Sequence, residues 1–389
     1  MDYKLLSEVS VYRKDRISSD KVNKENYIST ENMLPNRGGV ESATTVASAK
    51  TFSAYKKGDI LLSNIRPYFK KTWYADKEGG CSNDVLVVKA GKSVDSKFLY
   101  YVLSDNNFFN YSTVTSKGTK MPRGSKNAIM KYWVPDLDLP TQKKIADILS
   151  SYDELIKANN ERIELLEQAA QELYKEWFVR FRFPGYENAK FEDGFPKGWT
   201  IKRLADYGRV ETGKTPSTDV LENYGGEMMF VKTPDMHGNI FIIQTEDKLS
   251  ERGHNAQPKK LLPANSIMVS CIGTAGVVSI NAEPAHTNQQ INSIILNNPN
   301  ELEWLYHTCK SLKDTIELFG ATGATMTNLS KGKFEKLKVV DPREDLILEY
   351  HNKVHPLFNE IKSLMYQNQN LAAQRDMLLP RLMSGKLEV

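Results

Sequence analysis

The chain has few cysteines and no long apolar run, and each shortage excludes a class of protein. Its 389 residues include three cysteines, odd in number and far apart, at Cys81, Cys271 and Cys309. This usage predicts a reducing cytosol and argues against a disulfide framework or a thiolate metal site. The longest nonpolar stretch, residues 266–280, is interrupted by Ser, Gly and Thr and is too short to span a bilayer. Because the first residues show no signal-peptide pattern, we expect a cytoplasmic protein that does not contact a membrane.

The net charge of +4 is small, but it is unevenly distributed. Residues 1–140 carry 22 Lys and Arg against 15 Asp and Glu, a net charge of +7. Residues 183–345 carry 18 basic against 21 acidic side chains, a net charge of −3. The basic first segment indicates a polyanionic partner. If the second segment binds the same ligand, its positive groups must gather on one face.

A heptad pattern of helix length occurs twice, at a constant offset of 205 residues. Its mostly apolar positions alternate steps of four and three from Ile145 to Trp177, and again from Tyr350 to Leu382. This spacing keeps one stripe facing a partner helix, so we predict that the two helices pair. An antiparallel pair with full overlap brings Asn159 opposite Asn368. A buried polar pair penalises slipped registers; the alternative is that both side chains are partly exposed.

The repeat also covers the segments before the two helices. Residues 118–136 match residues 323–341 at the same offset, whereas residues 63–65 match residues 270–272 at an offset of 207. Short apolar runs between turn signals predict strands in both segments. We therefore predict an α+β fold with a pseudo-two-fold internal repeat, in which two similar mixed α/β domains are separated by two long helices that form an antiparallel coiled coil. The predicted boundaries are residues 1–140 and 184–345 for the domains, and residues 141–183 and 346–389 for the helices.

One strong-looking motif predicts a phosphate-binding loop but lacks the right context. Residues Gly208 to Thr215 match the formula of that loop letter for letter. The loop needs a helix directly after it, whose N-terminus holds the phosphates. Pro216 disfavours a helix at the preceding residue. We therefore interpret the match as false, and keep a nucleotide-binding enzyme that uses Lys214 and Thr215 as an alternative.

A second motif is the histidine pair His351 and His355, which lie four residues apart on the second long helix. This spacing can hold a metal ion. The sequence shows no third ligand nearby, and the pair flanks the heptad seam. We therefore interpret both histidines as solvated residues beside the seam and predict no metal site.

Polar, aromatic and basic side chains concentrate in the predicted loops of both domains. Arg, Lys, Asn and Gln make paired hydrogen bonds to base edges, and Lys, Ser and Thr also bind phosphate, so we predict a DNA-binding surface in each domain. For any single residue the alternative is an ordinary solvated side chain. The candidates in the first domain, led by Arg66 and Arg123, are Thr30, Asn32, Asn36, Arg37, Arg66, Tyr68, Lys70, Lys71, Lys117, Thr119, Lys120 and Arg123. The candidates in the second, led by Lys214, Lys232 and Gln289, are Lys214, Thr215, Ser217, Lys232, Thr233, His237, Arg252, Thr274, Asn288, Gln289, Gln290, Thr325, Thr327 and Asn328.

At these residues the chain resembles the specificity subunit of a type I restriction–modification system. The similar segments are spread over the whole chain, at residues 27–33, 58–68, 81–84, 118–146, 173–178, 213–217, 231–235, 288–290 and 375–385. The loop at residues 213–217 is similar to a recurrent loop of this family, which explains the false phosphate-loop match. The second domain departs from the first, because residues 272–276 stand where residues 65–69 would be.

The resemblance implies a non-catalytic subunit in which each domain is a target recognition domain that reads one half of a bipartite, asymmetric site in double-stranded DNA. It also implies that the paired helices fix the spacing between the halves and dock two methylation subunits, and that restriction and translocase subunits join this core. No cofactor is expected in this chain, since S-adenosylmethionine, ATP and Mg belong to the partner subunits. A third hypothesis is a coiled-coil scaffold that does not bind DNA, against which the basic first domain argues.

Overall fold

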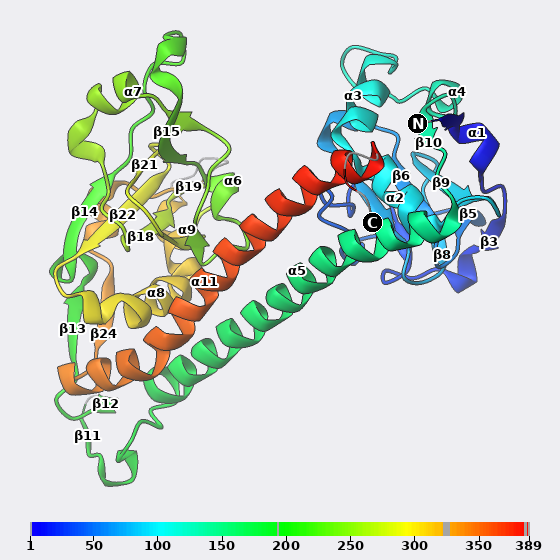
Figure 1. The fold of residues 1–389 in the computed structure, drawn as a ribbon. Helices are drawn as coiled ribbons and strands as arrows, with labels where there is room; N and C mark the ends of the chain where they lie inside the picture. The colour runs from blue at the N-terminus through cyan, green and yellow to red at the C-terminus, as the bar shows by residue number, and fades with distance from the viewer. Residues whose placement is uncertain (1, 193, 322–326, 385–386, 388–389) are drawn as a thin grey trace. The chain divides into compact units, whose positions relative to one another are not determined.

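The computed structural model describes residues 2–192, 194–321, 327–384 and 387 (Figure 1). The chain divides into two compact units. Unit 1 comprises Met1–Lys157 and Gln369–Val389, and unit 2 comprises Ala158–Asn368. Both boundaries fall inside the long helices α5 (Leu139–Tyr174) and α11 (Glu344–Met383). Each compact unit therefore contains one predicted domain together with part of both predicted helices.

The centre of unit 1 is a four-stranded antiparallel sheet in the order β2-β9-β6-β7. Residues of β6 alternate between two cores, since Ile60 and Leu62 face one buried cluster and Leu61 faces the other. A strand that is buried on both faces reads as a continuous apolar run, which is why this segment is recognisable in the sequence. A second sheet, in the order β3-β5-β8-β4, contains the parallel pair β4 and β8. The strand bounds are β1 Tyr3–Leu5, β2 Ser10–Tyr12, β3 Arg16–Ser18, β4 Tyr27–Ile28, β5 Thr51–Tyr55, β6 Ile60–Ser63, β7 Thr72–Tyr74, β8 Gly79–Cys81, β9 Val85–Ala90 and β10 Trp133–Pro135.

Short helices cover one face of this sheet in unit 1. The carboxylate of Asp95 accepts hydrogen bonds from the backbone N–H groups of Lys97 and Phe98, which caps the first of the two main helices. The buried residues of this helix, α2, include Phe98 and Leu99, which belong to the same hydrophobic cluster as Ile60. The bounds are α1 Leu6–Val9, α2 Ser96–Ser104, α3 Asn106–Val114 and α4 Lys126–Ile129, with 3₁₀ turns η1 Ser19–Lys21 and η2 Pro67–Phe69.

Unit 2 repeats the core of this arrangement, with β14, β22, β18 and β20 in the places of β2, β9, β6 and β7 and one further strand, β16, at the edge. Its five-stranded sheet has the order β14-β22-β18-β20-β16. In β18, Ile267 and Val269 face one cluster and Met268 faces the other, as in β6. The parallel pair β4 and β8 corresponds to the parallel pair β15 and β21. The strand bounds are β11 Phe191–Glu192, β12 Phe195–Pro196, β13 Thr200–Arg203, β14 Gly208–Thr212, β15 Tyr224–Val231, β16 Phe241–Ile242, β17 Lys248–Leu249, β18 Ile267–Ser270, β19 Ile272–Gly273, β20 Val278–Asn281, β21 Ala285–Thr287, β22 Ile291–Leu296, β23 Thr327–Asn328 and β24 Lys338–Asp341.

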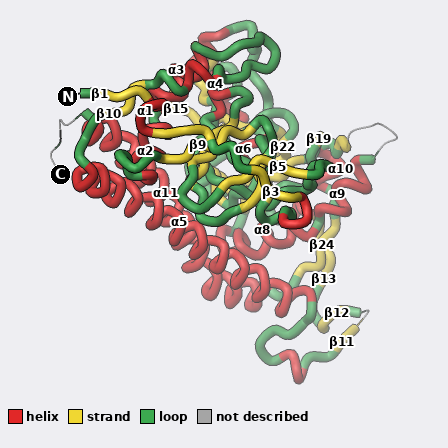
Figure 2. Tube along the Cα trace, turned by 90° about the vertical axis from the view of Figure 1, so that its right-hand side faces the viewer, coloured by secondary structure: helices red, strands yellow, loops and turns green. Residues whose placement is uncertain are grey.

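Helices α8, α9 and α10 follow the central strands of unit 2 in the same order as α2, α3 and α4 in unit 1, so the predicted α+β fold and its internal repeat are confirmed. Figure 2 shows the long helices α5 and α11 running side by side, with the strands and loops next to them. The bounds are α6 Thr233–Met236, α7 Glu251–Asn255, α8 Leu302–Ser311, α9 Lys313–Gly320 and α10 Lys331–Glu335, with short turns η3 Lys175–Val179, η4 Tyr186–Asn188, η5 Leu204–Asp206, η6 Leu221–Asn223, η7 Pro258–Lys260 and η8 Pro299–Glu301. No helix in the described residues is long and apolar enough to cross a membrane.

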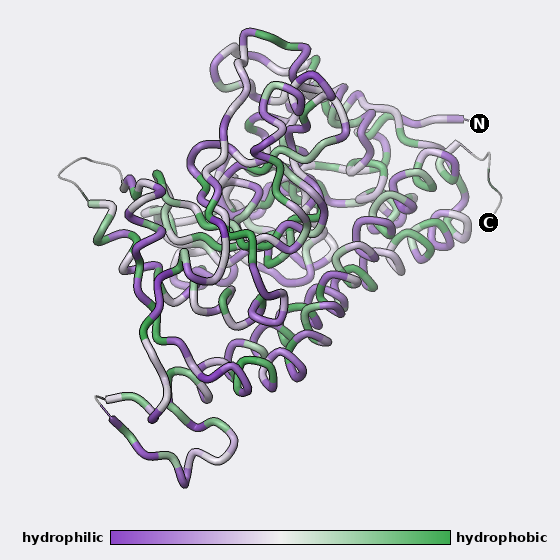
Figure 3. Tube along the Cα trace, turned by 90° about the vertical axis from the view of Figure 1, so that its left-hand side faces the viewer, coloured by the Kyte–Doolittle hydropathy of each residue, from purple (hydrophilic) through white to green (hydrophobic). Residues whose placement is uncertain are grey.

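The two long helices pair in the predicted antiparallel register. In unit 2, Asn159 Nδ2 donates to Asn368 Oδ1 over 2.8 Å, and the rings of Trp177 and Tyr350 lie 6.0 Å apart. Asn159 is 6% exposed and Asn368 is half-buried, so the alternative of two partly exposed side chains is wrong for Asn159. In unit 1, Ile145 and Leu382 face each other in this register, and both belong to one buried hydrophobic cluster together with Leu149. Figure 3 shows hydrophilic and hydrophobic residues alternating along both helices, as expected when each helix carries one apolar stripe.

Candidate nucleic-acid interface

In unit 1, four loop segments meet at the end of the sheet where β6 ends and β9 begins. The N–H of Arg66 donates to the carbonyl of Pro122 over 2.8 Å, and Ile65 forms a β-bridge with Arg123. The N–H of Asn36 donates to the carbonyl of Phe69 over 2.9 Å. Further backbone hydrogen bonds join residue 64 to residues 84 and 124. We call this set, residues 35–37, 64–71, 82–84 and 117–124, the first loop cluster.

Backbone strain is concentrated in this cluster. Six non-glycine residues of the described chain have a positive φ, and four of them, Asn36, Arg37, Arg66 and Lys70, lie in the first loop cluster. Each such conformation costs about 1–3 kcal/mol and persists only where the surrounding contacts enforce it. Because this cost recurs in loop segments that are hydrogen-bonded to one another, the loops are held in a defined shape.

The cluster presents cations and aromatic rings to solvent. Arg66 is exposed and lies 6.0 Å from the centre of the Phe69 ring, and the neighbouring Tyr68 is 46% exposed. Arg123 lies 3.3 Å from Asp84, in an exposed ion pair. A surface pair of this kind contributes little to stability, so the guanidinium is free to exchange its partner for a phosphate or a base. Lys117, Thr119 and Lys120 are also exposed, in the loop closed by reciprocal hydrogen bonds between residues 117 and 123.

Other predicted residues of unit 1 hold the loops in place. Asn32 is buried, and its amide bonds the backbone of residues 27, 29 and 41. Arg37 donates to the carbonyl of Ser104 over 2.6 Å and to the carboxylate of Asp376 over 2.8 Å. Lys71 Nζ donates to the carbonyl of Thr30 over 2.7 Å, and burial lowers its pKa. Because these polar groups are already bonded within the unit, we assign them a positioning role and leave Asn32 and Arg37 out of the proposed contact surface.

Lys70 and Asn36 are the remaining predicted contact residues of the first loop cluster. Lys70 Nζ donates to Asn106 Oδ1 over 2.8 Å, which ties the loop to the start of α3. Asn36 is exposed. The predicted contact residues did not include Phe69, Asp84 or Asn106, although Phe69 lies between two of them and Asp84 belongs to the family-like segment at residues 81–84.

In unit 2, loops meet at the same end of the repeated sheet. The N–H of Lys214 donates to the carbonyl of Thr287 over 2.9 Å, and the N–H of Asn288 donates to the carbonyl of Val231 over 3.1 Å. Strand β19 pairs with β23, with Ile272 opposite Asn328. The N–H of residue 271 donates to the carbonyl of residue 290. We call this set, residues 213–217, 231–233, 271–274, 288–290 and 327–328, the second loop cluster.

Gly213 allows these loops to approach one another. A Cβ atom at this position would lie 2.2 Å from the carbonyl oxygen of Asn288 and 2.2 Å from Thr287 Oγ1. Only glycine leaves room for this contact. Gly213 therefore allows these two loops to pack closely against each other.

The second loop cluster offers more amides and fewer free cations than the first. Lys214, Ser217, Thr274, Gln289 and Asn328 are exposed. Within the cluster, the amide of Asn288 and the hydroxyl of Thr233 both donate to Gln290 Oε1, and Thr215 Oγ1 donates to Gln289 Oε1. Lys232 forms an ion pair with Asp247. The exposed donors and acceptors with no hydrogen-bond partner among the described residues thus include those of Lys214 and Asn328, while Gln289 is exposed and bonded to Thr215.

The remaining predictions for unit 2 fall beside the cluster or outside the described residues. His237 is exposed at the end of α6, directly after the cluster segment at residues 231–233. Arg252 lies on α7, 4.0 Å from Glu222. Thr325 is not among the described residues, and for Thr327 the structure describes only its backbone place in β23.

The phosphate-loop alternative is not supported. Residues Gly208 to Thr212 form β14, which pairs antiparallel with β22. A segment without regular secondary structure follows, and the next helical element is the three-residue turn η6. No helix N-terminus therefore stands behind Lys214 and Thr215 to hold phosphates.

The interpretation of His351 and His355 as solvated residues is wrong for His351 and incomplete for His355. Nδ1 of each ring lies 2.7 Å from an oxygen of Glu303, whose side chain is fully buried. The His351 side chain is 15% exposed. The sequence hid this partner because Glu303 lies 48 residues before His351. The signal in the sequence that could have pointed to this partner was the acidic residue Glu303 among the apolar residues of α8.

The comparisons with known proteins agree with this architecture. A family model described as the type I restriction modification DNA specificity domain matches residues 5–168 and 196–344. The chain is 31% identical to the HindI specificity subunit of Haemophilus influenzae, over 86% of this chain and 87% of that protein. It is 27% identical to the MjaIX specificity subunit of Methanocaldococcus jannaschii, over 91% and 82%. The S subunit of a type I restriction-modification system from M. genitalium has a similar fold, with a TM-score of 0.57 and 16% identity over 98% of this chain and 95% of that one.

Proposed function

Since the chain belongs to the type I restriction–modification DNA specificity family and is a non-catalytic specificity subunit, we propose that each unit reads one half of a bipartite, asymmetric DNA site through its loop cluster. One observation carries the proposal. The bridge between Ile65 and Arg123 in unit 1 has its counterpart in the bridge between Ile272 and Asn328 in unit 2. The same backbone frame therefore presents different side chains in the two units.

The side chains in these frames suit direct reading of bases. A guanidinium pairs with the O6 and N7 atoms of guanine, and an Asn or Gln amide pairs with N6 and N7 of adenine. Arg66 and Arg123 supply the first kind of group, and Asn328 and Gln289 supply the second. Lys120 and Lys214 are exposed and suit phosphate contacts, which position the protein without reading sequence.

The paired helices and the partner subunits complete the proposal. The hydrogen bond between Asn159 and Asn368 supports one fixed register, and we infer that the helix pair sets the spacing between the two half-sites. Two methylation subunits dock on this pair, and restriction and translocase subunits join them. S-adenosylmethionine, ATP and Mg belong to those partners. A cytoplasmic location stays a prediction from the free cysteines.

Binding of DNA by the complete complex tests the proposal. Replacing Arg66 or Arg123 by Ala should cost about 1–3 kcal/mol of binding free energy and relax specificity at one base position. Lys120→Ala should weaken binding to all sequences alike and reduce the salt dependence. Lys92→Ala is a matched control, because this exposed lysine follows the opposite end of β9. If both arginine variants bind the site as the unaltered complex does, the assignment of the first loop cluster is wrong.

A further inference from the structure

A buried carboxylate and two imidazoles converge inside unit 2, away from the second loop cluster. Glu303 lies on α8, and His351 and His355 lie one turn apart on α11. One ring nitrogen of each histidine and one carboxylate oxygen of Glu303 lie within 4.8 Å of one another. The imidazole rings are 4.6 Å apart, centre to centre. The three side chains therefore already converge on one point, although they come from separate helices.

A fully buried carboxylate needs compensation, because an isolated charge is costly in a protein interior. Here one imidazole bonds each oxygen of Glu303, over 2.7 Å in both cases. Two histidines and one carboxylate are also the protein ligands of a common class of zinc site, in which a fourth position stays open. The spacing of four residues places both imidazoles on one face of a helix, as such sites require.

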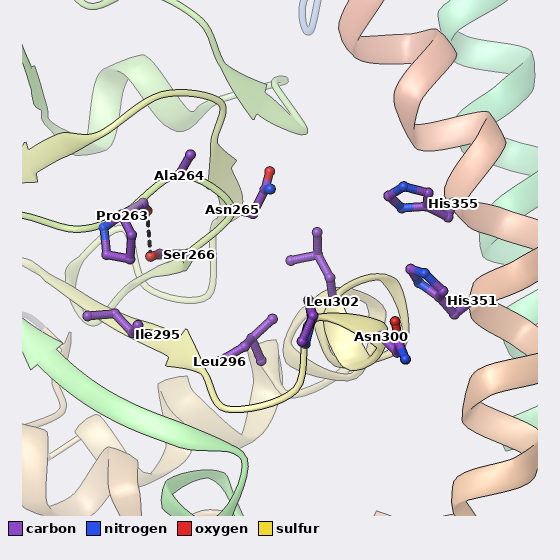
Figure 4. Close-up of a pocket in the computed structure, with 11 residues that line it drawn as sticks. Pro263, Ala264, Asn265, Ser266, Ile295, Leu296, Asn300, Leu302, His351 and His355 are labelled. Carbon is purple, nitrogen blue, oxygen red and sulfur yellow. Dashed lines mark hydrogen bonds between the residues drawn. The ribbon is translucent and has the colours of Figure 1, made fainter.

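The surroundings leave room for a fourth ligand. His351 and His355 line one side of a cavity of about 370 Å³ (Figure 4). The opposite wall comes from residues 263–266, and Asn300 lies on the same side as the histidines. Water in this cavity therefore has access to the two rings.

We propose that Glu303, His351 and His355 bind one divalent metal ion of the zinc class. In the metal-free form the Nδ1 protons bridge the rings to the carboxylate. When the ion binds, it takes the Nδ1 lone pair of each neutral ring, and each ring keeps its single proton on Nε2 instead. The bound ion ties α8 to α11 and so fixes the recognition domain of unit 2 on its helix.

Equilibrium dialysis of the purified full chain against Zn²⁺, followed by elemental analysis, tests this site. The expected result is one zinc ion per chain, and at least a tenfold loss of affinity in Glu303→Gln and in His355→Gln. His355 is the safer variant for folding, because 44% of its side chain is exposed. Co²⁺ absorption gives a second readout, since the ligand-field bands of the bound ion should disappear in the same variants.

His254→Gln is the matched control. Its Nδ1 lies 3.0 Å from Nε2 of His286, so this is another close imidazole pair, but one outside the Glu303 cluster. The control should keep the bound zinc, and zinc should raise the melting temperature of the control and of the unaltered chain but not of His355→Gln. The proposal is wrong if the unaltered chain binds no more zinc than His355→Gln, or if His254→Gln removes the bound ion. Neither readout depends on DNA, so this test is independent of the proposed reading of DNA.

Discussion

The two units have corresponding strands but different reading surfaces. Strands β6 and β9 in unit 1 correspond to β18 and β22 in unit 2, and each pair lies between two buried clusters. At the ends of these strands the first loop cluster carries Arg66 and Arg123, whereas the second carries Gly273 and Asn328 at the matching places. The apolar residues that build the sheet recur because packing constrains them. The residues at these matching places differ because backbone pairing, not their side chains, forms the two bridges.

The two ends of the helix pair also differ, and this difference predicts the largest effect on stability. Trp177 packs against the rings of Tyr350 and Phe178 in unit 2, whereas Ile145 belongs to the buried hydrophobic cluster of unit 1. Trp177→Ala should cost about 3–5 kcal/mol and Ile145→Ala about 2–5 kcal/mol. Hydrogen exchange reports each unit separately and should show the loss in the unit that carries the substitution. Equal loss of protection in both units would contradict two separable cores.

In the second loop cluster, Gly213 lies directly against the backbone of a neighbouring loop. Its substitution is expected to give the next largest loss of stability. A methyl group there meets backbone oxygen atoms that have little room to move, so Gly213→Ala should cost about 1–3 kcal/mol and weaken binding of DNA by the complex. Gly332→Ala is the control, since nothing lies within 4 Å of its added Cβ in helix α10. That change should be neutral or slightly stabilising. Similar losses in both variants would show that the close approach at Gly213 is unimportant.

An exchange of side chains between the two frames sharpens the comparison. Arg123→Asn gives unit 1 the side chain that unit 2 presents at Asn328. If both frames read bases, this change should shift the preferred base at one position and cost about 1–3 kcal/mol at the original site. Selection of bound sequences from a random pool by the complete complex measures the change. An unchanged consensus with uniformly weaker binding would instead place Arg123 on a phosphate.

The smallest predicted effect concerns the helices that follow the central strands. Asp95 caps α2 with two hydrogen bonds, whereas Glu301 precedes α8 without a side-chain cap, and burial raises the pKa of Glu301 to about 7. Because its folded pKa exceeds its unfolded value, the folded state binds more protons between about pH 4.5 and 7, and stability falls as pH rises through this window. Glu301 is partly exposed, so solvent screening limits the effect to about 1 kcal/mol or less. Glu301→Gln should flatten the dependence of unfolding on pH, and an unchanged profile would contradict this assignment.

The sequence alone could predict the architecture because its signals are local and periodic. The pairing of Asn159 with Asn368 follows from the heptad spacing, and the repeat follows from a constant offset. Which loop side chains remain free to contact DNA could not be predicted in the same way. Whether Arg37 is free depends on Asp376, which is 339 residues away, and the role of His351 depends on Glu303. A polar residue in a loop looks the same in the sequence whether it faces solvent or holds a neighbouring loop.

Methylome sequencing of a host that carries the complete system tests the central claim most directly, with Arg123→Ala and Asn328→Ala compared in parallel. The account predicts that Arg123→Ala relaxes one base position in one half of the methylated site, and that Asn328→Ala relaxes a position in the other half only. If both variants alter the same half, or if neither changes the methylated sequence, the two loop clusters do not read separate halves.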